Sequence, residues 1–173
     1  MKRMILVALS AVLLGIIAGS VVGGLKNQAQ ARPGEVRVTV IVEHYRDGKL
    51  INRVVDEKDP FTQNYVDMLK SGGSPSNSLI YIGDGNVAFS ISDTAMKGVN
   101  VLSRAPSAPQ ESIIDLKVNY TLSASFSLSS AMTIYEVGYA TNNKLLLRDL
   151  LPSPISAVAG DTVTVTYIIR VNG

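Results

Sequence analysis

The 173-residue sequence contains no cysteine and no tryptophan, and it has a single histidine. Without cysteine the chain has no disulfide, no thiolate metal site, no cysteine nucleophile and no lipid attached through sulfur. The absence of tryptophan removes a common anchor of interaction surfaces. Stability must therefore come from packing, from main-chain hydrogen bonds or from assembly with neighbouring subunits.

An excess of positive charge is also missing once the N-terminus is set aside. The chain has 16 basic and 14 acidic side chains. Three of the basic ones, Lys2, Arg3 and Lys26, lie in residues 1–31, which contain no acid, so residues 32–173 carry 13 basic side chains against 14 acidic ones. A near-neutral body without a basic stripe excludes nucleic acid as a partner.

The N-terminus has the pattern of an export signal. Lys2-Arg3 precede an uncharged, largely apolar run from Met4 to Leu25, and Ala29-Gln30-Ala31 follows after a polar spacer. A positive start, an apolar segment and an A-x-A ending together indicate a secretory signal peptide. We expect cleavage after Ala31, so that the mature chain begins at Arg32 and is extracellular or on the cell surface.

The apolar run also permits a second interpretation. It is longer than the apolar segment of most signal peptides and long enough to span a bilayer. In that case residues 4–25 stay as a membrane anchor, with the body outside because the positive residues remain in the cytoplasm. Under either interpretation the chain divides into residues 1–31, a signal peptide or anchor helix, and residues 32–173, one domain by size.

Alternating apolar residues predict β-structure through most of residues 32–173. Val36, Val38, Val40 and Val42 share one face of a strand, and Asp47-Gly48 turns the chain into a returning strand, Leu50 to Val55. Further strands are expected at the following ranges: 79–82, 87–91, 114–128, 132–140, 144–151 and 162–171. Residues 94–110 have weak patterning and predict an irregular crossing.

One short helix interrupts this pattern. Asp59-Pro60 has the form of a helix start, and Phe61, Tyr65, Met68 and Leu69 then share a face at helical spacing. Short strands with almost no linker predict an all-β, antiparallel two-sheet sandwich, jelly-roll-like, with this helix and the N-terminal leader helix added. A barrel with a similar number of strands is the alternative.

A search for chemistry finds weak candidates only. His44 lies near the tip of the first hairpin with no ligand spacing around it, which predicts an exposed strand-end histidine. Asp84 and Asn86 could begin a calcium loop, but the later acidic ligand is missing and a plain turn explains them. Asn119-Tyr120-Thr121 is an N-glycosylation sequon on the polar face of a strand. The sequence therefore predicts a protein that is not an enzyme and binds no cofactor or metal.

The start of the mature chain offers a different kind of site. Glu35, Val36, Val38, Val40 and Val42 form an alternating strand close to the expected new N-terminus. Such a strand either pairs within its own hairpin or adds to the open sheet edge of a neighbouring subunit. It is our candidate donor strand.

These features resemble a known class of proteins. The leader, the cysteine-free β-rich body, the alternating mature N-terminus and the Thr/Val-rich final strand are similar to archaeal extracellular filament subunits, the thread and bundling-pilus proteins. The resemblance implies a jelly-roll-like subunit whose N-terminal strand, here Glu35 to Val42, fills a groove in the next subunit. Segments of the C-terminal block also resemble the last strands of some viral structural proteins: Tyr135–Tyr139, Leu145–Asp149 and Ala159–Tyr167.

Three functions are therefore expected, in decreasing order. The first is an exported, non-catalytic subunit of a cell-surface filament or pilus that polymerises with itself. The second is a virion or membrane-anchored surface protein that keeps residues 4–25 as a transmembrane helix. The third is a secreted carbohydrate-binding module, which the scarcity of aromatic residues disfavours.

Overall fold

The computed structural model describes residues 36–57, 61–70, 78–108, 110–114 and 117–172. All of them belong to one compact unit, residues 32–173. The predicted leader, its cleavage site at Ala29, Ala31 and Arg32, and Glu35 lie outside the described residues, as does the predicted helix start at Asp59-Pro60. Within the described ranges, no helix is both long and apolar enough to cross a membrane.

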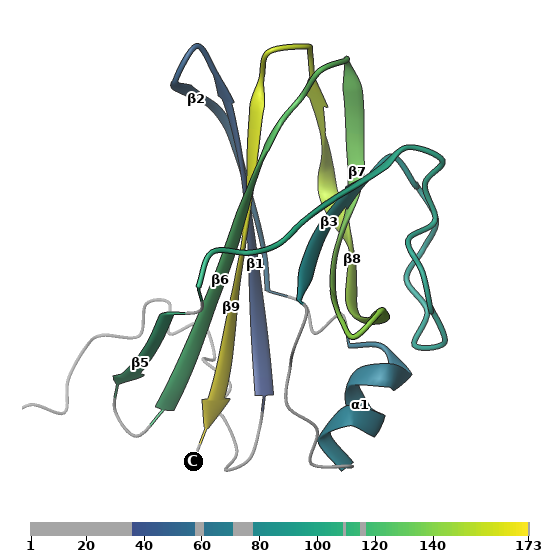
Figure 1. The fold of residues 1–173 in the computed structure, drawn as a ribbon, viewed down its shortest axis with the longest axis vertical. Helices are drawn as coiled ribbons and strands as arrows, with labels where there is room; N and C mark the ends of the chain where they lie inside the picture. The colour runs from purple at the N-terminus through teal and green to yellow at the C-terminus, as the bar shows by residue number, and fades with distance from the viewer. Residues whose placement is uncertain (1–35, 58–60, 71–77, 109, 115–116, 173) are drawn as a thin grey trace, which may run out of the picture. The chain divides into compact units, whose positions relative to one another are not determined.

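The first sheet contains five antiparallel strands in the order β2-β1-β9-β6-β5 (Figure 1). The bounds of these strands, in chain order, are β1 Val36–Arg46, β2 Lys49–Asp56, β5 Gln110–Ile114, β6 Lys117–Ser127 and β9 Thr162–Asn172. β1 and β9, the first and last strands, pair over ten residues from Val36↔Val171 to Tyr45↔Thr162. The first strand therefore occupies an interior position in this sheet.

The second sheet contains four antiparallel strands in the order β4-β3-β7-β8. Their bounds are β3 Leu79–Gly83, β4 Val101–Arg104, β7 Met132–Thr141 and β8 Lys144–Ala157. One short helix, α1, covers Gln63–Lys70, and Phe61 stacks on Tyr65 with ring centroids 4.4 Å apart. For the part of the chain that the structure describes, the prediction of a mostly β protein with two antiparallel sheets and one short helix is confirmed.

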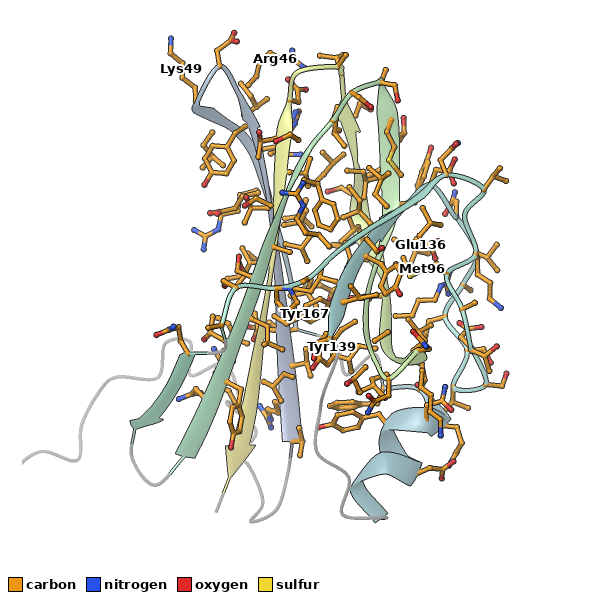
Figure 2. The ribbon with its side chains drawn as sticks, viewed as in Figure 1. Arg46, Lys49, Met96, Glu136, Tyr139 and Tyr167 are labelled. Carbon is orange, nitrogen blue, oxygen red and sulfur yellow. The ribbon has the colours of Figure 1, made fainter. Side chains whose placement is uncertain are left out.

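The inner faces of both sheets contribute to one buried apolar cluster (Figure 2). From the first sheet come alternate residues of β1, β6 and β9, among them Val38, Val40, Leu122, Phe126 and Val165. From the second come residues of β3, β7 and β8, among them Ile80, Ile82, Ile134, Leu147 and Ile155. The apolar residues that alternate along β1, β6 and β9 therefore face the core, and the polar residues between them face the surface. This arrangement fits a β-sandwich.

The predicted turn at Asp47-Gly48 is confirmed, and a second hairpin turn has the same backbone form. Asp47 and Gly48 both have positive φ, 50° and 74°, and they join β1 to β2. Asn142 and Asn143 join β7 to β8 with φ of 49° and 61°. Positive φ at both central residues matches the right-handed twist of a hairpin, and it suits Asn, Asp and Gly.

Three strand predictions are wrong. The expected strand 114–128 begins too early: Ile114 belongs to β5 and pairs with Lys117, the first residue of β6, whereas the rest of the predicted strand is β6 to Ser127. The period-2 alternation of the sequence does not mark this change of strand, because no glycine stands there. Residues 87–91 form no strand. β8 continues through Pro152 and Pro154 to Ala157 instead of ending at Leu151, because a strand at the edge of a sheet tolerates a residue that cannot donate to a ladder.

Candidate functional site

The most unusual feature of the described structure is a fully buried arginine on β8. Arg148 donates from Nε to Glu136 Oε2 on β7 at 2.6 Å and from Nη1 to Asp93 Oδ2 at 3.0 Å. Its Nη2 donates to the Val87 carbonyl at 2.8 Å. Arg148 and Glu136 have no exposed surface, and Lys97 Nζ lies 3.0 Å from the other carboxylate oxygen of Asp93. Two cations therefore balance two carboxylates.

This ion cluster holds the long segment of residues 84–100 against the second sheet. Glu136 Oε1 accepts hydrogen bonds from the main-chain N–H groups of Lys97 at 2.9 Å and Gly98 at 2.7 Å. Burial by itself raises the pKa of Asp93, but the Ser90 N–H and the positive charges of Lys97 and Arg148 hold that pKa below its usual range. Charge-assisted bonds, and not strand pairing, thus fix this segment.

The glycines around Glu136 leave room for its carboxylate. A Cβ at Gly85 would lie 2.5 Å from Glu136 Oε1 and 2.5 Å from the Gly98 nitrogen. A Cβ at Gly83 would lie 2.7 Å from the same oxygen. The close approach of main chain to carboxylate therefore requires residues without a side chain at both positions.

We expect Gly85→Ala to lower the free energy of unfolding by about 1–3 kcal/mol, because the added methyl group forces Glu136 or residues 97–98 to move. Urea denaturation monitored by circular dichroism measures the loss. Asn86→Ala, at the exposed neighbouring position, is the control and should change stability by less than about 0.5 kcal/mol. Equal stability of the two variants would contradict the tight fit around Glu136.

A second buried cluster joins the first hairpin to the turn before β9. His44 Nε2 lies 2.7 Å from Asp161 Oδ2, and Arg46 donates to both oxygens of Asp161 at 2.9 Å. The Val158 N–H donates to Oδ2 at 2.8 Å. His44 and Asp161 are buried, so the prediction of an exposed histidine is wrong. Burial of His44 is favourable because it pairs with Asp161, which lies 117 residues away in the sequence. No local sequence pattern indicates this pairing.

Acid should weaken this second cluster. The hydrogen bonds from Arg46, then from Val158 and His44, hold the pKa of Asp161 well below its usual range. A carboxylate with a lowered folded pKa stabilises the fold above its unfolded pKa, about 3.9, and this contribution is lost as the pH falls further. We expect the stability of Asp161→Asn to depend less on pH than that of the parent between pH 4 and pH 2. Urea titrations at several pH values test this, and parallel pH profiles would contradict it.

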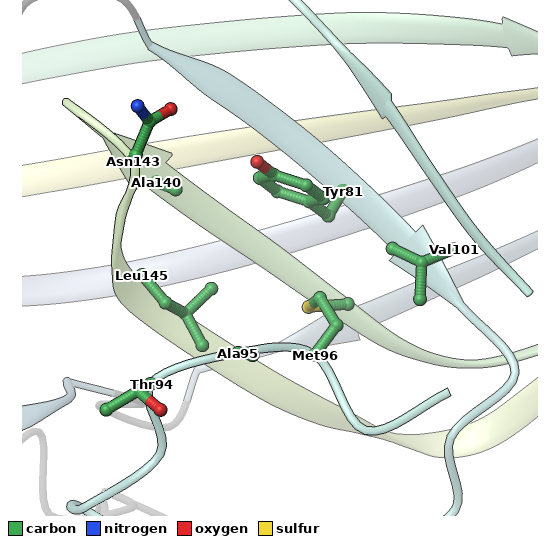
Figure 3. Close-up of a pocket in the computed structure, with 8 residues that line it drawn as sticks. All are labelled: Tyr81, Thr94, Ala95, Met96, Val101, Ala140, Asn143 and Leu145. Atoms are coloured by element: carbon green, nitrogen blue, oxygen red, sulfur yellow. The ribbon is translucent and has the colours of Figure 1, made fainter. Parts of the chain in front are cut away.

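A shallow groove of about 340 Å³ lies beside the first cluster (Figure 3). Its lining residues are Tyr81, Thr94, Ala95, Met96, Val101, Ala140, Asn143 and Leu145. They come from β3, β4, β7, β8, the turn between β7 and β8, and the 84–100 segment. The lining is mostly apolar and holds no charged side chain. The groove is therefore a small, mostly apolar recess that no charged side chain lines.

The core also contains a polar atom for which the described residues offer no hydrogen bond. The Tyr167 hydroxyl on β9 is buried and has no partner among them, and the centroid of the Tyr167 ring lies 6.1 Å from that of the Tyr139 ring. Burial raises the pKa of Tyr167 well above its usual value, and the negative charge of Asp149 raises it further. This hydroxyl therefore stays protonated and cannot act as a base at neutral pH.

The other candidates from the sequence lie in structural roles. Asp84 accepts hydrogen bonds from the main chain and side chain of Asn100 at 3.0 and 2.6 Å, so its carboxylate secures the ends of the 84–100 segment. Asn119 of the sequon lies on β6 between Ser112 and Arg170 of the neighbouring strands. Within the described residues, no group of three or more histidines and carboxylates is placed to hold a metal ion.

The candidate donor strand, Val36 to Val42, lies within β1, and its partners are β2 and β9 of the same chain. Val38, Val40 and Val42 are buried in the core. Sequence reasoning missed the Arg148 cluster, although a signal was present: Arg148 follows Leu145-Leu146-Leu147, where a charge on a buried strand requires a buried partner.

Comparison with known proteins adds no family. No family model, no curated protein and no solved structure matches this chain.

Proposed function

We propose that this chain is an exported structural subunit of a cell-surface filament, without catalytic activity, that assembles by exchange of its first β-strand between subunits. The observation that carries the proposal is the position of β1. It is the first strand of the described chain, yet it lies inside the five-stranded sheet, between β2 and β9. Without β1, an apolar groove would open between those two strands.

The first strand of a neighbouring subunit fits that groove, because it has the same sequence as the strand that fills it here. It would restore the main-chain ladder with β9 and place Val38, Val40 and Val42 back in the core. The exchange requires the two-residue turn at Asp47-Gly48 to open, and a short hinge loop is the usual site of such exchange. After the exchange, the contacts of β1 with its neighbouring strands join one subunit to the next, whereas before it they lie within one subunit.

The remaining parts of the proposal come from the sequence. The positive, apolar and A-x-A segments of residues 1–31 support export, and the absence of cysteine suits a subunit stabilised by packing and strand pairing. A jelly-roll-like connectivity of the strands and an N-terminal leader helix are also parts of the proposal that come from the sequence. The charged groups of both described ion clusters bond to partners inside the chain, which supports a structural role for them.

Because the chain has no cysteine, a designed disulfide tests the exchange directly. Ile41 in β1 lies opposite Thr166 in β9, and Ser123 in β6 lies opposite the same Thr166 on its other side. In filaments of Ile41→Cys/Thr166→Cys, exchanged strands should give a covalent ladder of subunits on a denaturing gel. Ser123→Cys/Thr166→Cys is the matched control and should give monomers. Only monomers from both variants, or an absence of filaments under the electron microscope, would reject the proposal.

A further inference from the structure

A methionine sulfur lies where the 84–100 segment meets the second sheet. Met96 is partly exposed and belongs to the lining of the groove beside the Arg148 cluster (Figure 3). Its Sδ lies against β7, because a Cβ placed on Gly138 would be only 2.5 Å from it. The same Cβ would lie 3.3 Å from Leu145 Cδ1 on β8. The sulfur therefore fills the space above Gly138 and has no room to move toward the sheet.

Met96 also lies between the contacts that hold this segment in place. Asp93, three residues earlier in the sequence, accepts a hydrogen bond of 3.0 Å from the buried arginine on β8. The two N–H groups that follow Met96, those of Lys97 and Gly98, donate to Glu136 Oε1 at 2.9 and 2.7 Å. A displacement of Met96 from the sheet therefore strains hydrogen bonds on both of its sides.

We propose that Met96 is a modification site, a methionine whose oxidation to the sulfoxide by a peroxide loosens the 84–100 segment from the second sheet. In this reaction the sulfur attacks one oxygen of hydrogen peroxide, an S–O bond forms and the O–O bond breaks. The sulfur loses two electrons, and the second oxygen leaves with both protons as water. The groove gives a peroxide access to the sulfur, and the chain has no cysteine that would react in its place.

The sulfoxide does not fit where the thioether fits. Oxidation adds volume and a hydrogen-bond acceptor at a sulfur that already contacts Gly138, and the Leu145 side chain beside it has no donor. Donors are present in the groove, on the side chains of Tyr81, Thr94 and Asn143 and in water (Figure 3). The oxygen therefore turns into the groove and draws the sulfur away from the sheet.

Peroxide treatment of the full chain in mild detergent, followed by peptide mass mapping and amide hydrogen exchange, tests the proposal. Met96 should gain one oxygen atom, and exchange at Lys97 and Gly98 should accelerate by about fivefold or more, while exchange within β9 stays unchanged. An unoxidised Met96 in the folded chain would overturn the proposal. Unchanged exchange after its oxidation, or an equal acceleration within β9, would overturn it as well.

The modification should also be reversible. Methionine sulfoxide reductase converts the sulfoxide back to the thioether, so exchange at Lys97 and Gly98 should return to the rates of the untreated chain. Rates that stay raised after Met96 has lost its added oxygen would show damage of another kind and would overturn the proposal.

Two leucine variants separate Met96 from the rest of the five methionines in the chain. Leucine replaces methionine with little change in volume and has no sulfur to oxidise. Peroxide should leave exchange at Lys97 and Gly98 unchanged in Met96→Leu, whereas the acceleration should remain in Met132→Leu, whose methionine is also partly buried. Acceleration in the first variant, or its loss in the second, would assign the effect to another methionine and reject the proposal.

This inference concerns the second sheet and does not depend on the exchange of β1, which belongs to the first sheet. The covalent ladder from Ile41→Cys/Thr166→Cys reports on strand exchange alone. Failure of one proposal is therefore distinguishable from failure of the other.

Discussion

Arg148→Met should lower the free energy of unfolding by about 4 kcal/mol, one of the largest effects we expect from a single substitution. Methionine fills most of the volume, but Glu136 then remains fully buried without the cation that balances it. The Val87 carbonyl also loses its donor. Denaturation in urea measures the loss, and amide hydrogen exchange at Lys97 and Gly98 should accelerate because their acceptor is Glu136.

The cause of this loss can be separated from a general packing defect. In Arg148→Met/Glu136→Gln the unpaired charge is gone, while the amide oxygen can still accept from residues 97 and 98. We expect the second substitution to recover at least about 1 kcal/mol in this background and to destabilise the parent chain. If Glu136→Gln costs the same in both backgrounds, the interpretation of Arg148 and Glu136 as a coupled pair is wrong.

Local chemistry explains why much of the architecture could be predicted from the sequence. Alternation at Val38, Val40 and Val42 is a property of neighbouring residues, and positive φ at Asp47-Gly48 is available to few other residue pairs. The exclusion of cysteine chemistry needs only the composition. Such features act within a few residues of each other, so one sequence is enough to show them.

The ion clusters could not be predicted because their partners are distant in the sequence. Arg148 meets Asp93 across 55 residues, and His44 meets Asp161 across 117. The leucines before Arg148 indicate that this arginine is buried, but nothing near it in the sequence shows which carboxylates it meets. The same reason explains the failed strand at residues 87–91: its carbonyls bind a buried arginine, which replaces the neighbouring strand that the alternating pattern suggested.

Phe126→Ala should lower the free energy of unfolding by about 3–5 kcal/mol, because Phe126 is 3% exposed and lies in the cluster shared by both sheets. The chain offers a matched control in Phe89, which lies in the 84–100 segment and is 37% exposed.

Phe89→Ala should cost about 1 kcal/mol or less, since charge-assisted bonds hold that segment and little apolar surface is lost on truncation. The midpoint of urea denaturation compares the two variants directly. If Phe89→Ala proved as damaging as Phe126→Ala, residues 84–100 would be part of the apolar core, and the Arg148 cluster would not be what holds them. A small loss at Phe89 together with a large loss in Arg148→Met would instead assign the anchoring of this segment to buried charge.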